Sequence, residues 1–123
     1  MTPIYLIVGG ALGTLARYYA GLAITNATGG RALATFAINI TGSFVIGLFL
    51  ALGQERSAWS NALVLLVAVG FLGGFTTFST FAWQTLQLAE DGNSAGALLN
   101  VGGSIAAGLL AVWAGASLGR AVS

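Results

Sequence analysis

The stretch 75–81, FTTFSTF, places four hydroxyl residues and three phenylalanines in seven consecutive positions of an apolar region. Hydroxyl groups can donate hydrogen bonds to an anion, and the edge of an aromatic ring carries positive potential. Phe75, Phe78 and Phe81 recur at every third position, so on a helix they lie near one face. Such side chains can line a path for a small anion without a fixed charge that would trap it. The residue types therefore indicate a small-ion channel or pore, with tight helix packing as the alternative.

Two adjacent glycines, Gly73 and Gly74, come directly before this stretch and weaken a helix there. A break at this pair would expose carbonyl groups on one side and amide donors on the other. Broken helices are tolerated in a membrane where the freed backbone faces protein or water. We therefore predict that the helix containing 70–81 is broken near its middle.

Polar side chains at helical spacing in other segments could face the same path. Thr35, Asn39 and Ser43 stack on one face, and Asn100 and Ser104 repeat the four-residue spacing. Such groups can equally form hydrogen bonds between helices. Asn39 is the hardest to assign to packing alone, because an amide at mid-membrane must have its donors and acceptors satisfied.

The composition excludes several kinds of chemistry. The chain has no cysteine and no histidine, which excludes thiolate chemistry, imidazole metal sites and disulfides. Its three acids all lie in predicted loops, whereas a proton-coupled transporter generally needs an ionisable group inside the membrane. The net charge of +1 leaves no basic patch that could follow a phosphate backbone. We expect no enzyme, no proton antiport and no nucleic-acid partner.

Arg17 is the one charged residue inside a predicted helix, and its guanidinium does not release a proton in proteins. Two interpretations are open. The long side chain can snorkel to the membrane interface, or it can face a water-filled vestibule and attract anions.

The elements that must position these residues are transmembrane helices. The chain is 57% hydrophobic and 6% charged with a mean hydropathy of +0.92, against about 25% charged residues in soluble domains. Segments 3–24, 33–53, 62–89 and 96–118 can each cross a ~30 Å hydrocarbon layer, which takes about 20 residues. The loops are short, so we predict an all-α membrane protein with a single four-helix domain over 1–123. The third segment exceeds the length of one crossing, which a tilt or a break would explain.

Small residues recur at four-residue spacing in every predicted helix, a pattern that lets helices approach closely in lipid. The pairs are Gly9 with Gly13, Ser43 with Gly47, Gly70 with Gly74, and Ser104 with Gly108.

The arginines give no signal for orientation. Cytoplasmic loops normally carry an excess of Lys and Arg, yet Arg17 and Arg31 lie toward one side here and Arg56 and Arg120 toward the other. Such a chain can insert both ways, and two opposed copies can pair about a two-fold axis. We expect a dual-topology antiparallel homodimer; the alternative is that four arginines are too few and a partner sets the topology.

The segments GGALGTLARY, TFAINITGSFVIG and GGFTTFSTF together resemble the bacterial Fluc fluoride channels, over nearly the whole chain and in the same order. The third segment is highly specific. The resemblance implies a fluoride-selective passive channel in the bacterial inner membrane, which exports cytoplasmic fluoride and reduces its toxicity. It also implies membrane lipid and a second, antiparallel copy as partners, with two fluoride pathways in each dimer.

The resemblance further assigns roles to residues of this sequence. It implies that ring edges of Phe78 and Phe81 contact fluoride, and that backbone carbonyls of Gly73 and Thr76 hold a structural Na⁺ on the dimer axis. Other positions implied by the resemblance are Asn39, Ser79, Thr80 and Ser104 in the fluoride pathway and Arg17 in the vestibule. The fourth helix departs from the pattern, since some members have an aromatic residue and two serines where this chain has Asn100, Ser104 and Gly108.

Two other functions stay open. One is a dual-topology small-solute exporter of the four-helix type, although such exporters rely on a carboxylate in the first helix and this chain has none there. The other is a non-conducting membrane packing subunit.

Overall fold

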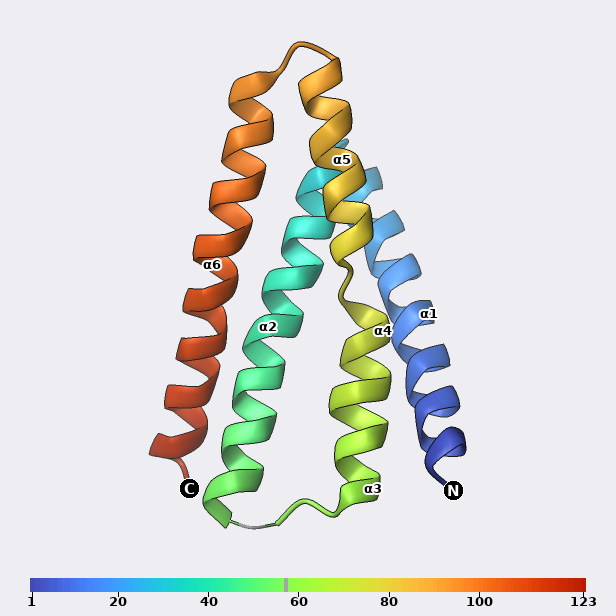
Figure 1. Ribbon diagram of the computed structural model, residues 1–123, viewed down its shortest axis with the longest axis vertical. Coiled ribbons are helices and arrows are strands. Elements are labelled where there is room, and N and C mark those ends of the chain that lie inside the picture. The colour runs from blue at the N-terminus through green and yellow to red at the C-terminus, as the bar shows by residue number, and fades with distance from the viewer. Residues whose placement is uncertain (57) are drawn as a thin grey trace.

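The computed structural model describes residues 1–56 and 58–123, and its described secondary structure is entirely helical. Four helices are long and apolar enough to cross a membrane, as predicted, and both termini lie at the same end (Figure 1). In chain order the elements are α1 (Thr2–Thr28), α2 (Arg31–Arg56), α3 (Asn61–Val64), the π-helix η1 (Leu65–Leu72), α4 (Gly73–Phe75), α5 (Phe78–Glu90) and α6 (Ser94–Ala121).

The four helical segments extend beyond the predicted bounds of 3–24, 33–53, 62–89 and 96–118. The clearest case is the end of α1, where Thr25–Thr28 were expected in a loop and are helical. The Thr28 hydroxyl donates to the Ile24 carbonyl at 2.7 Å. The helix stops at Gly29, which has a φ of 75°, and the Gly29 N–H donates to the Thr25 carbonyl at 2.7 Å. Polar residues thus continue the helix until a left-handed glycine ends it.

The third membrane segment changes conformation along its length. The π-helix η1 leads into α4, after which Thr76 (φ −86°, ψ 156°) and Thr77 (φ −150°, ψ 124°) are extended before α5 begins. We placed the weak point at Gly73 and Gly74, but Gly73 is helical, with φ −63° and ψ −38°, and both glycines belong to α4. Gly74 serves close packing instead, because a Cβ atom there would come within 2.7 Å of the Gly10 carbonyl oxygen.

Glycines bring α1 against η1 and α4. A Cβ atom on Gly9 would collide with the Leu66 carbonyl oxygen, and one on Gly13 would collide with the Phe71 carbonyl oxygen. A Cβ atom on Gly70 would lie 3.0 Å from the Gly9 Cα. The predicted close packing is confirmed for the pairs Gly9 with Gly13 and Gly70 with Gly74, which meet each other across this contact.

A second glycine contact joins α2 to α6. A Cβ atom on Gly47 would meet the Val112 carbonyl, and one on Gly115 would meet the Phe44 carbonyl. Gly47 belongs to a predicted small-residue pair, whereas Gly115 was not singled out. The fold therefore consists of two close helix contacts, between α1 and the third segment and between α2 and α6.

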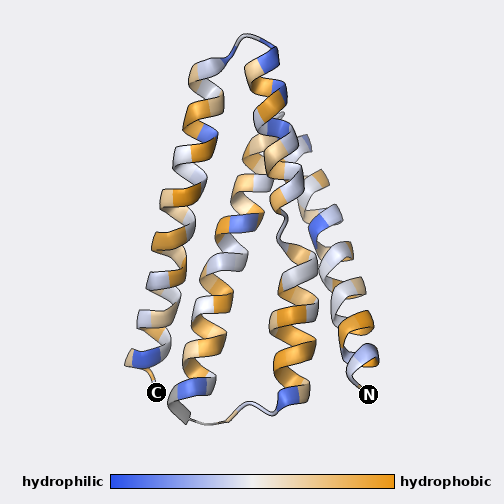
Figure 2. Cartoon of the chain, in the orientation of Figure 1, coloured by the Kyte–Doolittle hydropathy of each residue, from blue (hydrophilic) through white to orange (hydrophobic). Residues whose placement is uncertain are grey.

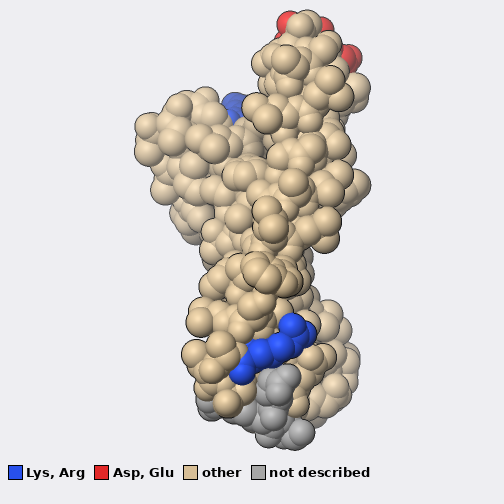
Figure 3. Space-filling view, turned by 90° about the vertical axis from the view of Figure 1, so that its left-hand side faces the viewer, with Lys and Arg blue, Asp and Glu red and all other residues tan. Residues whose placement is uncertain are grey.

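Few large side chains are buried within the single chain. The buried hydrophobic residues are Ala34, Ile38, Ala51, Ala68, Leu72 and Ala97. Hydrophobic residues run along all the long helices and hydrophilic ones gather mainly near their ends (Figure 2). This distribution suits lipid, where packing of small residues holds helices together because apolar tails solvate the rest. The acids Glu90 and Asp91 lie at the turn between α5 and α6, at one end of the molecule (Figure 3).

Replacing Gly13 by alanine should destabilise the fold, because the added Cβ would overlap the Phe71 carbonyl and force α1 away from η1. Overpacking of this kind typically costs about 1–3 kcal/mol. Thermal melting of the detergent-solubilised protein, followed by size-exclusion chromatography, measures the change. Gly10→Ala is the matched control on the same helix, since a Cβ atom there meets nothing within 4 Å. Equal melting temperatures for the two variants would show that this contact does not hold the helices.

Candidate functional site

One side chain from α2 holds the extended pair between α4 and α5. Asn39 Nδ2 donates to the Thr77 carbonyl at 2.9 Å, and Asn39 Oδ1 accepts from the Thr77 N–H at 2.8 Å. The amide therefore pairs with both polar groups of one extended residue, as a neighbouring strand would. Backbone groups left unsatisfied at membrane depth cost several kcal/mol each. Asn39 thus makes an extended residue tolerable at this position.

This pairing also changes the end of α4. In a continuous helix the Thr77 N–H would reach the Gly73 carbonyl, but it donates to Asn39 instead. The Thr76 N–H and the Thr76 hydroxyl both donate to the carbonyl of Leu72, the residue before Gly73, at 3.0 and 2.9 Å. The Gly73 carbonyl therefore loses its helical donor and stands at the negative end of the α-helical turn.

Thr77 also begins α5. Its hydroxyl accepts from the Thr80 N–H at 3.3 Å, which is the usual capping contact of a threonine at a helix start. The same hydroxyl donates to Thr80 Oγ1 at 3.2 Å. Because Thr77 supplies that hydrogen, the hydroxyl hydrogen of Thr80 is left to donate elsewhere.

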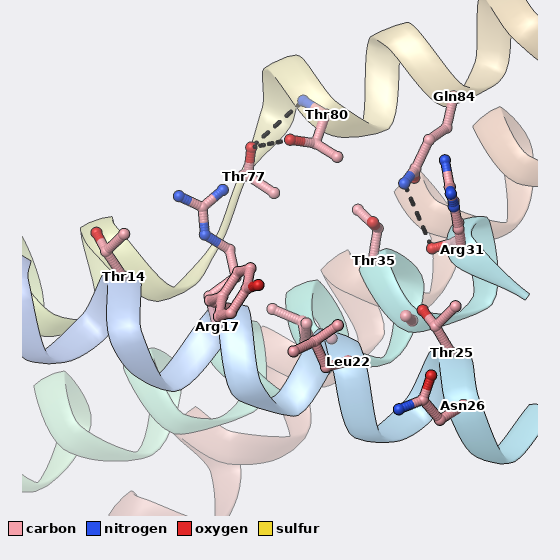
Figure 4. Close-up of a pocket in the computed structure, with 14 residues that line it drawn as sticks. Thr14, Arg17, Leu22, Thr25, Asn26, Arg31, Thr35, Thr77, Thr80 and Gln84 are labelled. Carbon is pink, nitrogen blue, oxygen red and sulfur yellow. Dashed lines mark hydrogen bonds between the residues drawn. The ribbon is translucent and has the colours of Figure 1, made fainter.

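A cavity of about 660 Å³, called here the arginine cavity, opens between α1, α2 and α5. In Figure 4, Arg17 points from α1 toward Thr77 and Thr80 at the start of α5. Within the described part of the chain its lining includes no Asp or Glu. Its polar lining residues are Thr14, Arg17, Tyr18, Thr25, Asn26, Arg31, Thr35, Thr77, Thr80 and Gln84.

The position of Arg17 bears on its two interpretations. Because α1 ends at Thr28 rather than near Ile24, Arg17 lies 11 residues from the helix end, or roughly 16 Å of helix. It is partly buried and lines the arginine cavity. This placement favours the vestibule over snorkelling.

A second cavity of about 300 Å³, the asparagine cavity, lies between α2 and the third segment. Thr77 lines both cavities, so the residue that Asn39 holds is shared between them. The asparagine cavity is uncharged: it is lined by Asn39, Gly42, Ser43, Ile46, Ala68, Leu72, Gly73, Thr76, Thr77 and Phe78.

The structure brings together only part of the predicted pathway set. Phe78 lines the asparagine cavity and is 78% exposed, and its ring lies 5.5 Å from that of the half-buried Phe81, tilted by 54°. Thr80 lies in the arginine cavity. Ser79 is exposed and lines neither of these two cavities.

The predicted residue on α6, Ser104, has a buried hydroxyl with no hydrogen-bond partner among the described residues. Its neighbours on that helix have different surroundings. Asn100 Nδ2 donates to Thr85 Oγ1 at 2.9 Å, and a Cβ atom on Gly108 would lie 3.9 Å from Ser43 Oγ.

One residue with a clear contact at the site was missed: Thr85 on α5, which accepts from Asn100 on α6. Thr77 was included among the hydroxyl residues of 75–81, but its role as the cap of α5 was not predicted. A hydroxyl residue directly before a helix start is a signal for a cap, but that signal depends on knowing where α5 begins. Thr85 offers no such signal, because its partner belongs to another helix.

Residues 4–116 match the family described as "CrcB-like protein, Camphor Resistance (CrcB)". The chain belongs to the CrcB family. All of the site residues described above fall within the matched range.

Individual CrcB relatives agree with this assignment over almost their full length. The protein of Acidobacterium capsulatum named "Fluoride-specific ion channel FluC" is 44% identical over 123 residues, which is 99% of this chain and 98% of that protein. The protein of the same name from Solibacter usitatus is 44% identical over 125 residues, covering 98% and 99%. "Fluoride-specific ion channel FluC 2" of Natronomonas pharaonis is 43% identical over 122 residues, covering 99% and 97%.

These matches confirm the family resemblance seen in the sequence motifs. The CrcB relatives are named as ion channels, and an ion channel is not an enzyme. With four apolar helices, the chain is a multi-pass membrane protein.

Replacing Asn39 by leucine should expose the Thr77 amide, because leucine keeps a similar size but supplies neither hydrogen bond. Each buried backbone group left without its partner costs about 1–3 kcal/mol. Hydrogen exchange followed by mass spectrometry should show faster exchange in peptides covering 76–80. Asn26→Leu, at an exposed position on α1, is the control and should leave that exchange unchanged. Unchanged exchange in Asn39→Leu would mean that Asn39 does not hold the extended pair.

Proposed function

We propose that this protein is a fluoride-selective channel through which fluoride leaves the cell passively. The observation that carries the proposal is that Thr77, held by Asn39, lines both the arginine cavity and the uncharged asparagine cavity, which Phe78 also lines. The names of the CrcB relatives, each a fluoride-specific ion channel, support the choice of ion.

The arginine cavity would collect the anion. Arg17 and Arg31 line it without an opposing acid among the described residues, so the local potential favours anions. Thr80 follows at the start of α5 with a hydroxyl hydrogen that its neighbour leaves free. Fluoride would therefore exchange part of its hydration water for a neutral donor next to a region of positive charge.

Beyond Thr80 the proposed path contains neutral groups. Phe78 and Phe81 would offer ring edges, and the unpartnered hydroxyl of Ser104 would offer a further donor. Asn39 would act by keeping Thr77 extended, and Ser79 would complete the pathway set from an exposed position. Neutral donors bind a small anion and also release it, which is the condition for conduction.

We propose that two copies associate antiparallel in the bacterial inner membrane, each pair providing two fluoride pathways. The even division of arginines between the two ends supports insertion in both directions. The exposed ring of Phe78 and the exposed Gly73 are surfaces that a second copy would cover. Efflux would need no coupled ion, because fluoride enters as membrane-permeant hydrofluoric acid, dissociates and leaves down its electrochemical gradient.

The backbone at the end of α4 would supply ligands to a sodium ion. The Gly73 carbonyl has lost its helical donor to Asn39, and Gly73 is exposed and lines the asparagine cavity. Carbonyl oxygens suit hard cations, and the carbonyl end of a helix attracts positive charge. We propose that Gly73 and Thr76 of two copies would together hold one Na⁺ on the dimer axis, where it would fix the two subunits together.

Replacing Phe81 by isoleucine should abolish fluoride flux and leave the folded dimer intact, because the ring edge is lost while apolar bulk is kept. Liposomes loaded with potassium fluoride, with valinomycin to balance charge, measure the release. Phe49→Ile is the control. Phe49 lies on α2 outside the proposed pathway, and its ring stacks on that of Trp59, with centroids 5.1 Å apart. Wild-type flux in Phe81→Ile would remove Phe81 from the pathway.

The same assay separates the candidate functions for the wild-type protein. A channel releases fluoride fast and retains chloride in a parallel experiment. Saturable exchange of solutes across the membrane would indicate an exporter. A dimer that releases neither ion would be a packing subunit, and the proposed function would then be wrong.

Gly73→Leu should prevent conduction or dimer formation, because the leucine would collide with the second copy and not with its own chain. Within one chain a Cβ atom at Gly73 meets nothing within 4 Å, so the isolated fold accepts a side chain there. Chemical cross-linking and fluoride efflux measure the effect. Gly102→Leu, at an equally open position on α6, is the control. If Gly73→Leu dimerises and conducts normally, the carbonyls of this turn do not meet at the axis.

A further inference from the structure

The backbone alone cannot fix the orientation of α5 relative to α4. Thr76 and Thr77 are extended, so the helical hydrogen bonds that make a helix stiff do not continue from α4 into α5. Helix α5 nevertheless carries Phe78, Thr80 and Phe81, whose placement the proposed pathway requires. Contacts with neighbouring helices must therefore set its tilt and rotation.

Three polar links join α5 or its cap to other helices among the described residues. Asn39 holds Thr77 at the start, and Gln84 Nε2 donates to the Arg31 carbonyl at 3.4 Å (Figure 4). The third link reaches α6, where Asn100 Nδ2 donates to Thr85 Oγ1 at 2.9 Å. The Gln84 contact is long, so the link to Asn100 is the stronger of the two along the body of α5.

The Asn100 link continues to the backbone of Phe81. The Thr85 hydroxyl donates its single hydrogen to the Phe81 carbonyl at 2.8 Å, and it can therefore only accept from Asn100. The direction of the chain is thus defined: Asn100 amide to Thr85 hydroxyl to Phe81 carbonyl. Thr85 stands one helical turn after Phe81, on the same face of α5.

We propose that Asn100 and Thr85 are positioning residues that fix the rotation of α5 and so aim the Phe81 ring. Neither residue needs to touch the ion, since the Thr85 hydroxyl hydrogen is already engaged. The proposal rests on the proposed function, because it assigns a role within the fluoride pathway. It gives a role to the Asn100 amide, which faces α5 from a helix made mainly of apolar and small residues.

Removing the side-chain polar group of either Asn100 or Thr85 should weaken conduction, because either change breaks the same hydrogen bond. We expect Thr85→Val and Asn100→Ala each to lower fluoride flux by about tenfold, the upper end of what one interhelical hydrogen bond in a membrane supports. The double variant should fall no further than the single ones, because the two residues act as one unit. Thr85→Ser, which keeps the hydroxyl, should stay within about twofold of wild type.

A second readout separates positioning from packing. The fluoride-to-chloride permeability ratio, measured from reversal potentials in planar bilayers, should fall in Thr85→Val and Asn100→Ala because the ring of Phe81 is no longer aimed. Thr41→Val is the matched control: the Thr41 hydroxyl also donates to the carbonyl four residues earlier, at 2.7 Å, but within exposed α2 surface. Its flux and its ratio should equal those of wild type.

The results that would overturn the proposal are distinct from failure of the proposed function. Wild-type flux and selectivity in both single variants, or independent additive losses, would show that the link does not aim Phe81. Loss of the folded dimer in both variants would make the pair a packing contact only, which also overturns it. Absence of fluoride flux in the wild-type protein would instead refute the function on which the proposal rests.

Discussion

The double hydrogen bond between the Asn39 side chain and the Thr77 backbone is the interaction on which the rest of the site depends. A membrane gives an extended residue no water with which to satisfy its N–H and C=O groups. By taking both groups, Asn39 allows α4 to stop and α5 to start in the middle of the third membrane segment. It also deprives the Gly73 carbonyl of its helical donor, so one side chain creates the free carbonyl end and the new helix start together.

Glycine contacts determine whether that interaction can form. Helix α1 is drawn against η1 and α4, and α2 against α6, at separations that no larger residue would permit. These two contacts fix α2, which carries Asn39, and α4, which precedes Thr77, without filling the space between them with large side chains. The arginine cavity and the asparagine cavity occupy that space.

Charged residues line only one of the two cavities, and the polar residues of the other cavity are neutral. The larger cavity is lined by Arg17 and Arg31, whereas the smaller one is lined by amide, hydroxyl, backbone, aliphatic and aromatic groups. Positive charge raises the local concentration of anions over distance, but at close range it would hold them. In the proposed channel, this separation would let an anion be attracted in one cavity and released from the other, with Thr77 lining both.

Hydropathy, length and small-residue spacing predicted the four membrane helices and the glycine contacts of α1, because these are local properties of the sequence and lipid imposes few other solutions. The need for a partner at Asn39 was also visible in the sequence. The identity of that partner was not, since Thr77 is 38 residues away and its extended conformation exists only when α2 crosses the third segment at the right height. For the same reason the glycine pair was mistaken for the interruption: Gly73 and Gly74 lower helix stability, but α1 packing keeps Gly74 helical, and Asn39 decides that Thr76 and Thr77 are the extended residues. The sequence by itself thus determined which segments cross the membrane and which residues needed partners, while the tertiary structure decided the pairings, because hydrogen bonds between helices depend on crossing geometry that no local pattern encodes.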